Sequence, residues 1–108
     1  MIKVYKIEDC FPIQDTCGTI YELFNSQNLS ISISKIKWKS IPHYHKKMEE
    51  MYYILSWKWL IFIGEETLSI KKWDLIPIPK NKYHHIESSD IEILVITHPK
   101  FSSDDVLI

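Results

Sequence analysis

The stretch Pro42-His-Tyr-His-Lys-Lys-Met-Glu-Glu-Met-Tyr-Tyr-Ile-Leu-Ser56 decides how the rest of the chain is interpreted. On an extended segment, residues i and i+2 point to the same side, so His43 and His45 can present two imidazoles to one point. The apolar segment that follows can return antiparallel beside the first and bring Glu49 or Glu50 near them. Only one of these carboxylates can point inward, and a buried Glu needs a charged partner. The stretch therefore predicts a metal site.

A second pair of histidines, His84-His85, follows the turn-prone segment Pro77-Ile-Pro-Lys-Asn-Lys-Tyr83. The two prolines and Asn81 fix the approach to a strand on which either His84 or His85 faces inward, but not both. Three imidazoles and one carboxylate form an N3O ligand set. This set suits one divalent Mn, Fe, Ni, Co, Cu or Zn ion and leaves coordination positions for water and substrate. The alternative interpretation is that the histidines are half-exposed surface residues.

Short strand patterns fill most of the chain. From 29 to 36 apolar and polar residues alternate with period two, which is typical of a strand with one buried and one wet face. Further segments rich in Ile, Tyr, Val and Phe are expected to be strands: 2–7, 19–24, 51–56, 60–63, 67–71, 75–78 and 91–97. A helix over 16–26 is disfavoured by Gly18 and two β-branched residues. Many short strands without a long helix indicate an all-β sandwich or barrel.

The stretch from Pro42 to Ser56 resembles the first motif of the cupin superfamily, in particular that of small single-domain cupins. In that motif HxH is followed by three or four residues and Glu, then by six residues and Gly, so the resemblance selects Glu50. Residues 74–84, Asp-Leu-Ile-Pro-Ile-Pro-Lys-Asn-Lys-Tyr-His, resemble the second motif, which assigns Pro79, places Asn81 in a glycine slot and selects His84.

The resemblance implies an all-β, cupin-type jelly-roll β-barrel, also called a double-stranded β-helix. Residues 1–108 would form a single cupin domain, with motif 1 at 38–57 and motif 2 at 73–88. The implied metal ligands are His43, His45, Glu50 and His84.

The resemblance leaves the function open between two classes. Cupins include dioxygenases, sugar isomerases and epimerases, decarboxylases, and sugar or effector sensors. We therefore expect a metal-binding barrel that acts on a small molecule, as a dioxygenase or a sugar isomerase or epimerase, or else a non-catalytic module that binds a small molecule. A purely structural metal is disfavoured because structural zinc sites usually have four Cys or His ligands. Tyr52, Tyr53 and His98 are candidate proton donors, and no catalytic base is assigned.

Composition and charge argue against several other classes. The 108 residues are 45% hydrophobic with a net charge of -1, which fits one folded domain and no electrostatic surface for nucleic acid. No apolar run approaches the roughly 18 residues that span a bilayer, and no signal peptide is visible, so a cytoplasmic protein without a membrane partner is expected. Cys10 and Cys17 lack a CxxC spacing and are expected to be free thiols. Cupins that resemble this chain often pair through barrel edge strands, so a homodimer is expected.

All four tryptophans, Trp38, Trp57, Trp59 and Trp73, stand where small cupins usually carry glycine. Residues 56–59 are expected to form a hairpin turn, in which positive φ disfavours a bulky residue by about 1–2 kcal/mol. Without this turn, residues 51–63 would form one strand that is far longer than the usual length of about five or six residues.

The chain has only two glycines, no Arg, no Ala and nineteen Ile, a usage that suggests an AT-rich gene. We hypothesise that the gene reads UGA as glycine, and UGG codons at the four positions would contradict this. The other interpretation is four genuine tryptophans that form an aromatic surface for a ligand.

Overall fold

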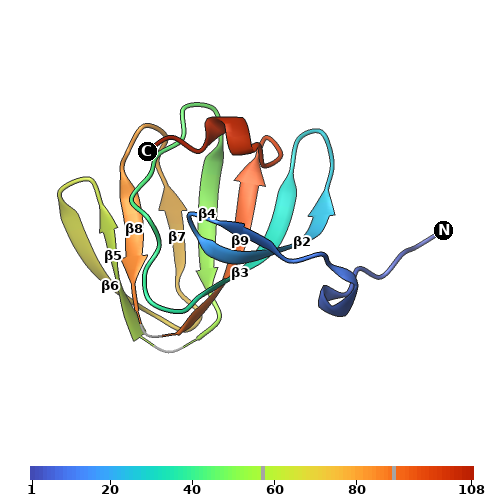
Figure 1. The fold of residues 1–108 in the computed structure, drawn as a ribbon, viewed down its shortest axis with the longest axis horizontal. Helices are drawn as coiled ribbons and strands as arrows, with labels where there is room; N and C mark the ends of the chain where they lie inside the picture. Colours follow the sequence, from blue (N-terminus) through green and yellow to red (C-terminus); the bar gives the residue numbers. More distant parts are fainter. Residues whose placement is uncertain (57, 89) are drawn as a thin grey trace.

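The computed structural model describes residues 1–56, 58–88 and 90–108 and is built almost entirely of strands (Figure 1). Two 3-10 turns, η1 (Ile7–Asp9) and η2 (Ser103–Asp105), lie near the ends of the chain. The strands are β1 (Ile13–Asp15), β2 (Gly18–Asn25), β3 (Ser30–Ile36), β4 (Glu49–Ile54), β5 (Lys58–Ile63), β6 (Glu66–Lys71), β7 (Leu75–Ile78), β8 (His84–Glu87) and β9 (Ile91–His98). The predicted all-β class is confirmed. In the described ranges, no helix has the length and apolar character needed to cross a membrane.

The strands form two antiparallel sheets. The large sheet has the order β1-β2-β3-β9-β4-β7, and the small sheet has the order β6-β5-β8. The chain passes repeatedly from one sheet to the other: β4, β7 and β9 belong to the large sheet, while β5, β6 and β8 belong to the small one. This alternation is the jelly-roll arrangement, and the inner faces of the two sheets enclose the interior.

The inner face of the large sheet changes from polar to apolar along its strands. At one end Glu50, Thr97 and Ser30 are register neighbours, and at the other end Ile36 pairs with Ile91. All five side chains are buried. The apolar end belongs to a core made of Ile36, Tyr52, Ile54, Ile61, Ile63, Ile70, Ile76, Ile78, Ile86, Ile91, Ile93 and Val95. Burial of such a side chain stabilises the fold by about 1.5–3 kcal/mol, so the core closes one end of the barrel and leaves the other end for a site.

Strand β3 turns its three serines inward, together with Ile36, and turns Ile31 and Ile33 outward. Ser30, Ser32 and Ser34 are buried, whereas Ile31 and Ile33 are half-exposed. The alternation predicted one buried and one wet face, and in the structure the polar residues occupy the buried one. We call these three serines the serine wall. Because serine is small, the wall leaves space inside the barrel that isoleucine would fill.

Two predicted segments differ in the structure. Residues 2–7 form no strand; most of them belong to an exposed arm that leads into η1, and no strand of the described chain pairs with their backbone (Figure 1). The segment between β4 and β5 is not a hairpin turn, because these strands lie in different sheets. Trp59 lies inside β5. A single strand over 51–63 is likewise absent, since β4 ends at Ile54 before the chain changes sheets.

The tryptophans occupy different backbone environments. Trp73 has a φ of 78° and Asn81 a φ of 63°, the left-handed region that favours glycine. Trp59 packs against the core and Trp38 is exposed, and neither has a positive φ. Trp57 lies outside the described residues. A conformational preference for glycine therefore exists at Trp73 but not at Trp38 or Trp59, and the codon hypothesis stays a prediction for gene sequencing.

Candidate metal centre

Four buried side chains converge at the polar end of the barrel: His43, His45, Glu50 and His84. Their ligand atoms all lie within 4.8 Å of one another. Glu50 lies on β4 and His84 begins β8. His43 and His45 precede β4 on a segment held by single bridges, from His43 to His84 and from Tyr44 to Leu107. The sequence predicted that this segment pairs with β4, and in the structure it does not. The fold still brings the four residues together.

In each of the adjacent pairs Glu49-Glu50 and His84-His85, one side chain points into the barrel and the other points outward. Glu50 is 5% exposed, whereas the Glu49 carboxylate lies outside, 3.5 Å from the Lys80 Nζ. His84 is 1% exposed, whereas the half-buried ring of His85 stacks on Phe62 with 4.6 Å between centroids. The reason is the alternation of side chains along β4 and β8. Glu50 and His84 are therefore the residues on the cavity side.

All three histidines have the same tautomer, because each Nδ1 contacts a backbone carbonyl, which can only accept a hydrogen bond. His43 Nδ1 donates to the Ile41 oxygen at 2.6 Å, and His84 Nδ1 donates to the Lys82 oxygen at 2.9 Å. His45 Nδ1 donates to the Asp105 oxygen at 2.7 Å. These bonds leave each Nε2 to face the cavity. A metal-binding imidazole usually donates its other ring N–H to such an acceptor, which fixes the orientation of the ring.

The ligand atoms are close together but unpaired. Nε2 of His45 lies 2.5 Å, and Nε2 of His84 lies 3.3 Å, from Oε1 of Glu50. None of these three atoms has a hydrogen-bond partner of good geometry. They therefore aim at a common point rather than at one another. Unpaired buried polar atoms are costly, and a cation at that point would satisfy all of them, so the residues present fit a divalent metal.

The pKa values of the cluster keep Glu50 ionised and shift those of His43 and His45 in opposite directions. Burial opposes ionisation of Glu50, but its contacts with His45 and His84 outweigh burial and hold its pKa at about 2. Burial and the neighbouring His84 lower the pKa of His43 to about 4. Burial also disfavours charge on His45, yet Glu50 raises the pKa of that imidazole above its ordinary value. Without a metal, a proton on His45 partly neutralises Glu50.

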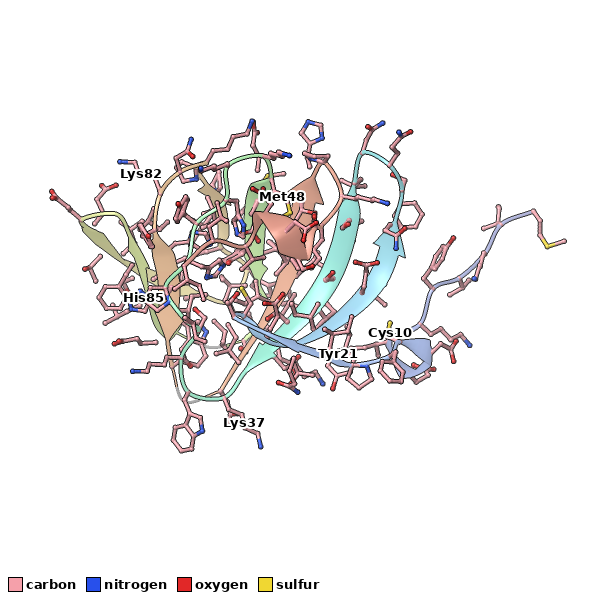
Figure 2. All side chains as sticks on the ribbon, turned by 45° about the horizontal axis from the view of Figure 1, so that its top comes forward. Cys10, Tyr21, Lys37, Met48, Lys82 and His85 are labelled. Carbon is pink, nitrogen blue, oxygen red and sulfur yellow. The ribbon has the colours of Figure 1, made fainter. Side chains whose placement is uncertain are left out.

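The C-terminal segment fixes the loop that joins the ligands. The Asp105 carboxylate accepts hydrogen bonds from the backbone N–H groups of Lys46, Lys47 and Met48 at 3.0, 2.9 and 2.7 Å. Figure 2 shows Met48 beside the C-terminal coil. Burial raises the pKa of Asp105, but these N–H groups outweigh it and lower the pKa overall. Sequence analysis missed Asp105 because an acidic pair near the chain end resembles any solvated surface.

Three of the four ligands, His43, His45 and Glu50, line a narrow cavity. Its lining comprises Asp15, Thr16, Cys17, Ile20, Ser32, Ser34, His43, His45, Glu50, Val95, Thr97, Phe101 and Val106. Cys17 Sγ lies 3.5 Å from His43 Nε2 and 3.8 Å from the Tyr52 hydroxyl. Thr97 Oγ1 is buried without a partner. Cys17 is a free thiol, as the sequence predicted, but its place beside His43 was not foreseen, and neither was that of Thr97, because both residues are remote from the ligands in the chain.

The three candidate proton donors lie in different places. Tyr52 is buried beside the ligands, with its ring centroid 6.1 Å from that of His84, and burial raises the pKa of its hydroxyl well above the ordinary value. Tyr53 packs on Trp73 outside the barrel. His98 is exposed, and its Nδ1 donates to the Asn28 carbonyl at 3.1 Å. Only Tyr52 of these three lies beside the ligand cluster.

Comparison with known proteins supports the fold. No family model matches the chain. An uncharacterized protein of Methanocaldococcus jannaschii is 34% identical over 82 residues, which cover 73% of this chain and 66% of that protein. A solved structure of a protein from Planctomyces limnophilus is similar with a TM-score of 0.89 and 21% identity, covering 100% of this chain and 97% of that one.

A second solved structure is that of Pac13 from Streptomyces, described as a β-barrel nucleoside dehydratase. It is similar with a TM-score of 0.84 and 16% identity, covering 98% of this chain and 89% of that one. At these identities the two solved structures show a shared fold and no more.

Proposed function

We propose that this chain, a small cupin-type β-barrel, binds one divalent transition metal through His43, His45, Glu50 and His84. At the coordination positions that remain open it binds, and in the enzyme interpretation transforms, a small molecule. The observation that carries this proposal is the convergence of four buried ligand atoms within 4.8 Å of one another, three of which, on His45, Glu50 and His84, have no hydrogen-bond partner. A hydrogen-bonded core network would pair these atoms with each other.

The donor set limits the metal. Three neutral imidazoles and one carboxylate suit Mn, Fe, Ni, Co, Cu or Zn, and hard ions such as Mg and Ca prefer oxygen ligands. When bound, such an ion supplies Lewis-acid chemistry or activates a ligand molecule. The protein supplies the orientation, because the Nδ1 hydrogen bonds of all three histidines fix their rings.

The small molecule would lie between the ligands and the serine wall. This part of the cavity combines Ser32 and the unpartnered Thr97 hydroxyl with the apolar side chains of Ile20, Val95 and Phe101. A polar group on the small molecule would satisfy Thr97, while its carbon atoms would contact the apolar residues. Tyr52 is placed to hold a proton beside the ligands, since its hydroxyl stays protonated at neutral pH.

We favour the enzyme interpretation over non-catalytic binding because all four ligand residues are buried, which would keep a reacting molecule away from bulk water. The Pac13 structure supports it by example, since that protein of the same fold is a dehydratase and has been solved with uridine. Dioxygenase and sugar isomerase or epimerase chemistry remain our specific candidates. The alternative is a binding module for a sugar or an effector, in which the metal orients the ligand without turnover.

The metal is tested by elemental analysis of protein purified without chelator, followed by thermal unfolding with and without added metal. We expect about one equivalent of metal per chain and a metal-dependent rise in the midpoint, which follows from preferential binding to the folded state. His84→Ala should abolish both, because it removes one of four ligands. The matched control is His85→Ala, a change on the outward side of the same strand, which should retain both.

A metal-free wild type whose stability is unchanged by every candidate ion and by His84→Ala would defeat the proposal. A small-molecule turnover screen of the loaded protein then separates the enzyme from the binding module. Binding without turnover, seen as a ligand-induced change in the visible spectrum of the Co(II) form, would favour the module.

A further inference from the structure

The thiol of Cys17 lies beside the four ligands of the candidate metal centre. Its Sγ is 3.5 Å from Nε2 of His43, which itself lies within 4.8 Å of the other three ligand atoms. Metal bonds of about 2.0–2.1 Å to nitrogen and about 2.3 Å to sulfur place two neighbouring ligands about 3.1–3.6 Å apart, at angles of about 90–110°. The sulfur therefore stands at the distance from His43 that a further ligand of the same ion would have.

The hydrogen bonds of the cluster single out His43. Its Nε2 has the Cys17 thiol as partner, whereas the buried Oε1 of Glu50 and Nε2 of His45 and His84 have none. Because His43 Nδ1 donates to the Ile41 oxygen, its Nε2 can only accept, so the thiol donates to it in the metal-free protein. A metal ion that takes the lone pair of this Nε2 removes the acceptor of the thiol. The sulfur then lies next to the ion, with its own lone pairs available for it.

Two hydroxyl groups lie close to the same sulfur. Thr16 Oγ1 donates to it at 3.9 Å, and the hydroxyl of the buried Tyr52 is 3.8 Å away. Sulfur is a weak acceptor as a thiol and a stronger one when it carries the negative charge of a metal-bound thiolate. The surroundings of Cys17 therefore suit a thiolate that is bound to a cation.

The backbone holds Cys17 in this position. Residues 16 and 17 form the turn between β1 and β2, and the Cys17 carbonyl accepts a hydrogen bond from the Ser34 hydroxyl on β3. Gly18 follows with a φ of 85°, and a Cβ at this position would overlap the Lys35 carbonyl oxygen. Only glycine lets the turn approach β3 so closely. The place of the sulfur is therefore fixed by the fold.

We propose that Cys17 is a fifth ligand, bound as a thiolate, of the metal that His43, His45, Glu50 and His84 hold. This inference rests on the proposed metal function and deepens it, because a thiolate changes which ion the site selects. On binding, a metal–sulfur bond forms, the S–H bond breaks and its proton passes to solvent. The donor set favours Zn over Mn, since a thiolate is a soft donor and Mn suits oxygen ligands. An octahedral ion keeps one position for the small molecule.

The test is the absorption spectrum of the full chain loaded with Co(II). A thiolate bound to Co(II) gives an intense charge-transfer band in the near ultraviolet, which imidazole and carboxylate ligands do not give. The matched control is Cys10→Ser, because Cys10 lies near the N-terminal end of the chain, with its Sγ 3.3 Å from the Glu22 carbonyl oxygen (Figure 2). We expect the band in the wild type and in Cys10→Ser. Cys17→Ser should lose it and still bind about one equivalent of Co(II).

Competition with a coloured chelator gives a second readout. Cys17→Ser should lower the affinity for Zn at least about tenfold and the affinity for Mn by a smaller factor, so the preference for Zn falls. If Cys17→Ser does not fold, the spectrum of Cys10→Ser decides alone, because the chain has two cysteines and Cys17 is then its one thiol.

The outcomes separate this inference from the metal function on which it rests. A Cys10→Ser protein that binds one equivalent of Co(II) without the band would overturn the fifth ligand and leave the four-ligand site intact. A Cys17→Ser protein that keeps the band would overturn it as well. A wild-type chain that binds no Co(II) and no other candidate ion would defeat both the fifth ligand and the proposed metal function.

Discussion

Asp105→Ala is the change that best separates the support of the metal centre from the centre itself. Asp105 binds no metal in our proposal, yet its carboxylate holds the loop 46–48 and its backbone carbonyl accepts the Nδ1–H of His45. The substitution removes the carboxylate and keeps the carbonyl. The loop that connects His45 to Glu50 should then lose its fixed shape, and both ligands should become less well placed for the metal.

The magnitude follows from what each N–H group can do after the change. Lys46 and Lys47 are exposed, so water replaces the carboxylate there and the loss is small. Met48 is buried, and its N–H at 2.7 Å would lose its partner, which costs about 1–3 kcal/mol. The Met48 term dominates, so we expect a total destabilisation of about 1–3 kcal/mol without metal. Loss of a group that supports the metal ligands typically lowers metal affinity by about 10–100-fold, and we expect the lower end of that range because the hydrogen bond to His45 Nδ1 remains.

Two measurements check this prediction. Urea unfolding of chelator-treated protein gives the change in stability, and competition with a coloured chelator gives the change in metal affinity. Asp104→Ala, at the adjacent exposed position, is the control and should alter neither. Asp105→Asn should rescue part of the affinity, since its amide oxygen can still accept. An Asp105→Ala protein with wild-type stability and wild-type metal affinity would refute the reasoning.

Three further predictions concern other parts of the site and the fold. In the metal-free protein the pKa of His43 is lowered from 6.5 to about 4, so between these two pH values the unfolded chain holds a proton on His43 that the folded protein does not. The free energy of unfolding therefore falls as the pH drops from 6.5 to about 4, by on the order of 3 kcal/mol at most. Urea unfolding against pH should show a flatter profile for His43→Gln, while the opposite contribution of His45, whose pKa is raised, is largely shared by both proteins. Trp73→Gly should be more stable than Trp73→Ala by about 1 kcal/mol, because only glycine adopts the φ of 78° without strain; equal stabilities in chemical denaturation would contradict this. The Cys17 thiol, whose pKa burial and the Glu50 charge raise to about 12, should resist thiol reagents in the folded protein and react after unfolding, and rapid modification of the native form, located by mass spectrometry, would argue against its burial.

Local sequence rules identified most of the strands, but not how they pair. Segments such as 75–78 and 91–97 were recognisable because they are short and rich in apolar and β-branched residues, which favour strands. The hairpin expected around Trp57 and Trp59 was wrong, because sequence spacing does not reveal that β4 and β5 belong to different sheets. Residues 2–7 also have a strand pattern, but a strand requires a neighbour, and the described chain offers them none.

Some residues of the candidate site were likewise predictable from the sequence, and others were not. His43 and His45 stand two residues apart, and alternation alone allows only one of Glu49 and Glu50 to point inward. The family pattern then selected Glu50 and His84, and the structure places both at the cavity. The places of Asp105, Cys17 and Thr97 beside the site were beyond the reach of sequence analysis. Their roles depend on contacts with residues far away in the chain, such as the bonds from Asp105 to residues 46–48.

The sequence by itself determined the all-β class, the spacing of the histidines and the inward or outward alternation within each strand. These properties depend on neighbouring residues and on the two-residue repeat of an extended backbone. Only the tertiary structure decided which face of β3 is the inner one. Alternation states that Ser and Ile lie on opposite sides, and packing against the small sheet and the cavity places the serines inside. That choice creates the space beside the metal ligands and leaves Ile31 and Ile33 half-exposed on the outer face.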